Sequence, residues 1–221
     1  MIRIYYYDIR EFPMEQFDEI IELVPQFFHS EILKYSLIRD RIRCLIGKIF
    51  VYKNYLDDSQ SKDSFVKKWF RDQNNKPQLK SWKSFNISHS GDFVIYAESS
   101  NHKTLGIDLE KINKEVNVLE LISFFLIEER QKIQESDDPT LIFFRLWVRK
   151  EALLKASGIG IVNGLNTCNC LKDEIYFDQE LWTILDIPFY DGYFLSLASH
   201  ANHENVYEIQ QFDNNLLNFF L

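Results

Sequence analysis

The chain of 221 residues has little of what marks several protein classes. It holds only three cysteines, five prolines and seven glycines. Cys44, Cys168 and Cys170 are odd in number and lack the spacing of zinc ligands, so we expect reduced thiols rather than a disulfide framework or a zinc site. The scarcity of glycine and proline, with 46% hydrophobic residues, argues against a fibrous or disordered chain.

Long apolar runs and an excess of positive charge are also missing. The longest apolar runs, such as 121–127, fall far short of a membrane span, and the opening MIRIYYYDIREF alternates like a strand and lacks the features of a signal peptide. We therefore expect a cytoplasmic protein. The net charge of −8 argues against general binding to nucleic acids or membrane surfaces, so any anionic ligand must meet a local cluster of cations.

One pattern occurs twice in the chain. The stretch GDFVIYAES (91–99) is echoed by DGYFLSLAS (191–199), and each reads as a turn followed by a short apolar strand. A helical pattern precedes each stretch, at 37–53 and at 140–158. The pattern predicts an α+β protein of two similar halves, 1–103 and 104–221, divided within a polar stretch.

The helix predicted at 140–158 has a start and a stop written in the sequence. Asp138 can cap it, Pro139 suits its first turn, and Gly158 suits a left-handed end. Helical spacing predicts one stripe that carries Trp147, Lys150, Glu151, Leu154 and Lys155. Read alone, Glu151 and Lys155 fit an ordinary ion pair on a solvated surface better than a functional site.

The sequence GIDLEK, residues 106–111, predicts a strand with two acids on one side. Asp108 and Glu110 then share a face, with backbones about 6.6 Å apart. Two like charges placed together are explained by a cation, and oxygen ligands suit Mg²⁺. Glu151 is the natural third carboxylate. The alternative is an exposed acidic strand face.

Two shorter motifs offer groups that can bind phosphate. FNISHSG (85–91) presents Ser88 and His89, although a structural histidine beside a turn fits as well. NNKPQL presents Lys76 before Pro77, an extended dipeptide that can hold the lysine over an anion or lie in a surface loop.

Taken together, NNKPQL, FNISHSG, GIDLEKI and LWVRKEALLKASGIG resemble, in order and spacing, the surfactin-synthetase (Sfp) type of 4′-phosphopantetheinyl transferase. The resemblance implies two α+β halves related by a pseudo-twofold axis, with coenzyme A and Mg²⁺ bound between them, in a monomer. It implies transfer of the 4′-phosphopantetheine arm of coenzyme A to a serine of an apo carrier protein, with release of 3′,5′-adenosine bisphosphate. The carrier can belong to fatty-acid, polyketide or nonribosomal-peptide synthesis.

The resemblance also implies roles for individual residues. The metal ligands are Asp108, Glu110 and Glu151, with Mn²⁺ open as an alternative to Mg²⁺. The residues that contact coenzyme A are Lys34 at the 3′-phosphate, Lys76 near the adenine, Ser88 and His89 at phosphates, and Lys155 at the pyrophosphate. Glu151 is the candidate base for the serine hydroxyl, and Lys155 completes the catalytic pair. Trp147 is expected to pack at the seam between the halves.

Three departures from the family pattern bear on these roles. Asn75 replaces the usual glycine before Lys76, but asparagine can also adopt a left-handed turn. Fewer basic residues precede the first long helix, which leaves Lys34 with His29, Arg39 and Arg43 as possible helpers. Leu126 and Ile127 replace a helix-capping serine in the segment expected to dock the carrier, where apolar contacts from 111–127 are expected to dominate.

Two alternatives remain open from the sequence. One is a noncatalytic module of the same fold that binds coenzyme A or docks a carrier; it predicts a missing carboxylate or a missing Lys155, and all four residues are present. The other is a compact carrier synthase restricted to fatty-acid synthesis, which is about half this length and works as a trimer.

Overall fold

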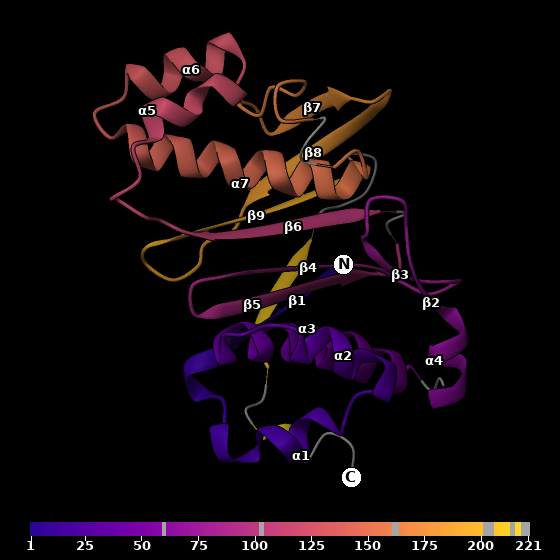
Figure 1. Cartoon of the computed structure of the whole chain (residues 1–221). Coiled ribbons are helices and arrows are strands. Elements are labelled where there is room, and N and C mark those ends of the chain that lie inside the picture. Colours follow the sequence, from indigo (N-terminus) through magenta and orange to yellow (C-terminus); the bar gives the residue numbers. More distant parts are fainter. Residues whose placement is uncertain (59–60, 102–103, 161–163, 201–205, 213–214, 218–221) are drawn as a thin grey trace.

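Helices and strands follow one another along the chain in the order shown in Figure 1, a computed structural model that describes residues 1–221 except 59–60, 102–103, 161–163, 201–205, 213–214 and 218–221. The helices are α1 (Phe17–Ile21), α2 (His29–Leu33), α3 (Ile38–Asp57), α4 (Lys62–Lys68), α5 (Val118–Leu121), α6 (Ile127–Gln134) and α7 (Pro139–Ser157). The strands are β1 (Ile2–Asp8), β2 (Trp69–Arg71), β3 (Pro77–Leu79), β4 (Ser84–Ser90), β5 (Phe93–Ser99), β6 (Leu105–Lys111), β7 (Glu174–Phe177), β8 (Glu180–Asp186), β9 (Tyr193–His200) and β10 (Tyr207–Gln211). None of the helices in the described part of the chain has the length and hydropathy that a membrane span needs.

Two four-stranded sheets form the centre of the molecule. The first has the order β10-β1-β5-β4 and the second β6-β9-β8-β7. All neighbours are antiparallel except β1 and β10, which run parallel. Because the strands are mostly antiparallel and the long helices lie outside the sheets, the predicted α+β class is confirmed.

The sheets and the two long helices stack in four layers. In Figure 1, α3 covers the outer face of the first sheet and α7 covers that of the second. Apolar residues of β1 and β5 pack against those of β6 and β9 between the sheets, where Ile95 and Ile107 are fully buried. At one edge β4 and β6 lie side by side, so the edge strand of one sheet meets the edge strand of the other.

The predicted repeat corresponds to equivalent parts of the two halves. The stretches at 91–99 and 191–199 form β5 and β9, each after a glycine with positive φ, 56° at Gly91 and 82° at Gly192. The two predicted helices are α3 and α7, and α3 continues four residues beyond its predicted end at residue 53.

The last strand requires a correction to the expected range of the C-terminal half, 104–221. β10 pairs with β1, with Ile2 opposite Tyr207, so it belongs to the first sheet. Phe212 and Leu216 then pack into the core beneath α3. The chain therefore crosses back to the N-terminal half, where β10 pairs with the backbone N–H and C=O groups at the edge of β1.

Candidate active site

β6 places the two predicted carboxylates at the edge where the sheets meet. Leu105, Ile107 and Leu109 point into the core between the sheets and are fully buried. Strand alternation therefore turns Asp108 and Glu110 to the other side, as the sequence predicted. Asp108 is only 2% exposed, whereas Glu110 is half-buried.

α7 crosses directly over β6 at Gly106. A Cβ atom at this position would overlap the backbone carbonyl of Ala152 and the amide of Ala156. The helix begins and ends as predicted, because Asp138 accepts a hydrogen bond from the amide of Leu141 at 3.0 Å and Gly158 adopts a left-handed φ of 76°. The close crossing brings the last turns of the helix, with Glu151 and Lys155, over the carboxylates of the strand.

Lys155 binds Asp108 rather than lying on a solvated surface. Its Nζ is 2.5 Å from Oδ1 of Asp108 and 3.1 Å from Oγ of Ser88. Ser88 donates to the same oxygen of Asp108 at 2.8 Å. The alternative of an ordinary Glu151–Lys155 surface ion pair does not describe this lysine, since it forms an ion pair with Asp108 on the strand.

The other carboxylate oxygen of Asp108 has no hydrogen-bond donor beside it in the described residues. Oδ2 is buried and, within the described residues, accepts no hydrogen bond. A buried carboxylate oxygen without a donor costs free energy, since it has lost water and gained nothing. This atom is therefore a place where a cation or a donor of a substrate would be favourable.

The surrounding charges shift the protonation of the neighbouring groups. Burial, and then the charge of Asp108, raise the pKa of Glu151 to about 7, although Lys155 opposes the shift. Burial also raises the pKa of Glu110, against the hydrogen bond that Ser90 donates to it. Burial alone would lower the pKa of Lys155, but the attraction of Asp108 and Glu151 outweighs it, so that pKa is raised. The carboxylates of Asp108, Glu110 and Glu151 thus repel one another in surroundings largely shielded from solvent.

These residues fit a divalent cation by their chemistry. The charges of Asp108 and Glu110 raise the pKa of Glu151, so the three carboxylates lie close enough to repel one another. One buried oxygen of Asp108 also accepts no hydrogen bond within the described residues, and carboxylate oxygens are the ligands that Mg²⁺ prefers. In the described part of the chain, however, no three His, Cys, Asp or Glu side chains are already gathered in the geometry of a metal site. The assignment of Asp108, Glu110 and Glu151 as ligands therefore stays a prediction.

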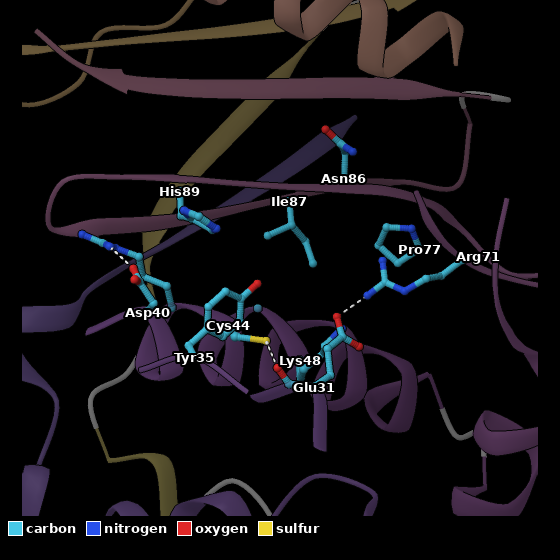
Figure 2. A pocket seen from close by; sticks show the side chains of 12 residues that line it. Glu31, Tyr35, Asp40, Cys44, Lys48, Arg71, Pro77, Asn86, Ile87 and His89 are labelled. Atoms are coloured by element: carbon cyan, nitrogen blue, oxygen red, sulfur yellow. Dashed lines mark hydrogen bonds and ion pairs between the residues drawn. The ribbon is translucent and has the colours of Figure 1, made fainter. Parts of the chain in front are cut away.

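Ser88 and His89 lie on opposite faces of β4. Ser88 is buried and faces β6, through its bond to Asp108. Figure 2 shows His89 pointing with Ile87 toward α3, while Asn86 points the other way. His89 lines a cavity of about 240 Å³. Packing around its ring, and then the charges of Arg43 and Lys155, lower the pKa of His89, although part of the residue is exposed.

That cavity carries two cations, Lys48 and Arg71, that the sequence did not single out. Lys48 lies 3.1 Å from Glu31, and Arg71 also binds Glu31. Arg43 donates to Asp40 at 2.6 Å. These residues line the cavity together with His89 (Figure 2). Only Arg43 was considered from the sequence; Arg71 is 40 residues from Glu31, so no local spacing could have revealed the cluster.

The two predicted lysines of the nucleotide region differ in their surroundings. Lys76 donates from Nζ to the carbonyls of Leu105, at 3.1 Å, and of Lys155, at 2.7 Å. Asn75 before it has a φ of 62°, the left-handed turn expected of it. Lys34 is exposed, with its Nζ 5.1 Å from the centre of the Tyr35 ring, and Tyr35 lines the cavity.

Two residues of α7 differ from the predicted stripe. Lys150 is fully buried, and its Nζ lies 2.8 Å from Oε2 of Glu129. It therefore points into the core of the C-terminal half and not toward Asp108 and Glu110. Helical spacing alone placed Lys150 on the stripe, and spacing does not reveal that Glu129 pairs with this lysine inside the core. Trp147 packs, as expected, but against Phe143, with ring centres 5.9 Å apart, rather than between the halves.

Comparisons with known proteins identify the family. Residues 104–186 match the model of the 4′-phosphopantetheinyl transferase superfamily, and residues 13–101 match that of the 4′-phosphopantetheinyl transferase N-terminal domain. The chain belongs to the 4′-phosphopantetheinyl transferase superfamily. The two matches follow the two halves of the fold, and the resemblance inferred from the four motifs is thereby confirmed.

Individual relatives agree with this assignment. The chain is 29% identical to the 4′-phosphopantetheinyl transferase gsp of Aneurinibacillus migulanus over 175 residues, which are 76% of this chain and 72% of the relative. It is 38% identical to psf-1 of Bacillus pumilus over 98 residues, 42% and 41% of the two chains. It is 29% identical to Sfp of Bacillus subtilis over 140 residues, 62% and 57% of the two chains. The chain spans about half the length of several curated relatives that it matches.

Proposed function

We propose that the protein transfers the 4′-phosphopantetheine arm of coenzyme A to a serine of an apo carrier protein, with Mg²⁺ or Mn²⁺, and releases 3′,5′-adenosine bisphosphate. The observation that carries the proposal is the arrangement around Asp108: Lys155 and Ser88 hold Oδ1, while Oδ2 is buried without a donor. A group transfer from a pyrophosphate needs such a pairing of a fixed cation and a place for a metal.

The cavity between β4 and α3 supports the nucleotide part of the proposal. The chain has a net charge of −8, yet three cations, Arg43, Lys48 and Arg71, line this cavity. They outnumber the two acids that line it and pair with them, Glu31 and Asp40. Arginine and lysine are the side chains that bind phosphate groups. In the proposal these residues, with Lys34, surround the nucleotide phosphates of coenzyme A.

A second hollow supports the expected position of the adenine end. It has a volume of about 260 Å³ and is lined by Lys76, Pro77, Lys155 and Gly158, among others. The ammonium group of Lys76 is hydrogen-bonded to backbone carbonyls of β6 and α7, so its side chain is held in place along this cavity. In the proposal the methylene groups of Lys76 contact the adenine end of coenzyme A. In the proposal Lys155 bridges from here to the pyrophosphate.

The acid–base chemistry falls to Glu151. In the metal-free protein, burial and the charge of Asp108 raise the pKa of Glu151 to about 7. A cation bound beside it would lower that pKa, so at neutral pH Glu151 would be the carboxylate that a general base needs to be. In the proposal Glu151 accepts the proton of the carrier serine, and Lys155 neutralises charge on the leaving phosphate. When bound by Asp108, Glu110 and Glu151, Mg²⁺ would supply further positive charge at the pyrophosphate.

The surface beside this site suits an apolar contact with a carrier. Leu119, Leu121, Phe124 and Ile127 are 51%, 37%, 52% and 66% exposed on the segment that runs from α5 to α6. Exposed apolar side chains gathered in one segment mark interaction sites. In the proposal the first half, 1–103 with β10, supplies nucleotide contacts, the second half supplies the carboxylates, and one monomer holds the complete site.

Intact mass spectrometry tests the function. The protein is incubated with coenzyme A, Mg²⁺ and a panel of apo carrier domains, and each carrier is weighed. The proposal predicts the mass gain of one phosphopantetheine arm on at least one carrier, lost when Mg²⁺ is chelated. Binding of coenzyme A without any mass gain across the panel would favour the noncatalytic alternative.

A further inference from the structure

β4 and β6 meet as edge strands of different sheets, and side chains join them. Strand alternation turns Asn86, Ser88 and Ser90 of β4 to the side that faces β6, which Figure 2 shows directly for Asn86. Ile87 and His89, in between, face α3 instead. Three polar side chains of one strand therefore lie along the neighbouring strand at every second residue.

Each of these side chains accepts a hydrogen bond from the backbone of β6. Oδ1 of Asn86 accepts from the amide of Ile107 at 2.9 Å, Oγ of Ser88 from Leu109 at 3.2 Å, and Oγ of Ser90 from Lys111 at 3.0 Å. The separation in sequence is 21 residues for all three, so the register is constant. These side chains satisfy amides that an adjacent strand would otherwise bind.

The two serines also donate to the two carboxylates of β6. Ser88 donates to Oδ1 of Asp108 at 2.8 Å, and Ser90 donates to Oε2 of Glu110 at 2.7 Å. A hydroxyl has one hydrogen to donate and lone pairs that accept. In each serine the oxygen accepts from a β6 amide, and the hydrogen is directed at the carboxylate beside it. Each serine thus fixes both the strand and the acid that the strand carries.

We propose that Ser90 is a positioning residue, which orients Glu110 so that its second oxygen, Oε1, is presented to the divalent cation. The inference rests on the proposed function, because that function supplies the cation. Hydrogen bonds to the outer side of a ligating group fix its orientation, and their loss weakens metal affinity by about 10–100-fold. Ser90 acts on Glu110 as Ser88 acts on Asp108.

Ser90 can be tested separately from the rest of the site. Ser88 also contacts Lys155, so its removal would disturb the ion pair with Asp108 as well. Ser90 lies at the end of β4 and is half-buried, and the amide that it accepts from belongs to the exposed Lys111. Water can reach that amide after removal of the hydroxyl, so Ser90→Ala is expected to fold.

Mn²⁺ binding measured by electron paramagnetic resonance, with coenzyme A present and no carrier, tests the inference without turnover. Ser90→Ala should raise the Kd for Mn²⁺ about tenfold. Ser90→Thr, which keeps the hydroxyl, should bind within twofold of the unaltered chain, which is about 0.4 kcal/mol. Ser84→Ala, at the other end of β4 opposite Ser99, is the matched control and should bind normally. Thermal unfolding of each variant verifies that it is folded.

The outcomes separate this inference from the function beneath it. If the unaltered chain binds Mn²⁺ and folded Ser90→Ala binds it equally tightly, only the positioning role is wrong. An equal loss of affinity in Ser84→Ala would also overturn it, because the effect would then be general to the strand. If the unaltered chain binds no Mn²⁺ with coenzyme A, the metal site itself is wrong, and the positioning role falls with it.

Discussion

Nζ of Lys155 lies 2.5 Å from Oδ1 of Asp108, and this ion pair ties the last turn of α7 to the middle of β6. Asp108 is 2% exposed and Lys155 24%. A buried carboxylate such as Asp108 is strongly destabilising unless the opposite charge that pairs with it is present. The same pair that is proposed to act on the substrate therefore also supports the fold.

Replacing Lys155 by methionine tests that structural role. The variant leaves Asp108 buried without its cation, and we expect the free energy of unfolding to fall by about 3 kcal/mol. The double variant Asp108→Asn with Lys155→Met should recover part of this loss, because no uncompensated charge remains. Urea unfolding of the single and double variants measures both values. A single variant as stable as the unaltered chain would contradict the prediction.

Gly106→Ala tests the close crossing of α7 over β6. The new Cβ would overlap backbone atoms of Ala152 and Ala156, which cannot rotate away, so the helix must move. We expect a loss of about 3 kcal/mol in the free energy of unfolding. Gly47→Ala in α3 is the control, since its Cβ would lie 3.5 Å from the side chain of Ile87 and alanine favours a helix. Similar unfolding curves for the two variants would contradict the account.

The sequence predicted the features that depend on neighbours in the chain. Asp138 and Gly158 set the ends of α7, and alternation along β6 set the faces of Asp108 and Ile107, because caps and strand faces are local properties. The same alternation would have separated Ser88 from His89, had β4 been treated as a strand. That signal was present and was not used.

Features that depend on distant parts of the chain were not predictable in this way. β10 joins β1 across about 200 residues, and no short pattern marks that pairing. Lys150 was expected on one stripe with Glu151 and Lys155, but its counterpart Glu129 lies 21 residues away on α6. A buried lysine is recognised only when the carboxylate that compensates it is known.

Stability should depend on pH through Lys76. Burial lowers the pKa of Lys76 to about 8, below its ordinary 10.5. Below pH 8 the lysine is charged in both the folded and the unfolded chain. Between about pH 8 and 10.5 the folded chain has released the proton while the unfolded chain keeps it, so this residue's contribution to stability rises with pH.

Urea unfolding across that range, in parallel with Lys76→Met, isolates this contribution from those of other groups. The free energy of unfolding of the unaltered chain minus that of the variant should increase as the pH rises from 8 to 10.5. If this difference in the free energy of unfolding stays constant or shrinks with pH, the pKa of Lys76 is not lowered by burial.

Carrier recognition should depend on apolar contacts more than on charge. Phe124, which is 52% exposed, is the largest of the exposed apolar side chains on the segment from α5 to α6, and Phe124→Ser should raise the KM for a carrier about tenfold. Tyr176→Ser, on β7 with 73% exposure, is the control and should leave KM unchanged. The KM of the unaltered chain should also vary little with salt, because a contact made by apolar side chains is screened little by ions. A steep rise in KM with salt would indicate docking by charge instead.

The rate of phosphopantetheine transfer by Glu151→Gln, at saturating coenzyme A, carrier and Mg²⁺, tests the central claim most directly. Glutamine keeps the shape of Glu151 but cannot accept the serine proton. It also removes one of the three carboxylates proposed to bind the metal, beside Asp108 and Glu110. We expect kcat to fall about a hundredfold or more, while thermal unfolding is preserved. A folded variant with a kcat close to that of the unaltered chain would contradict it.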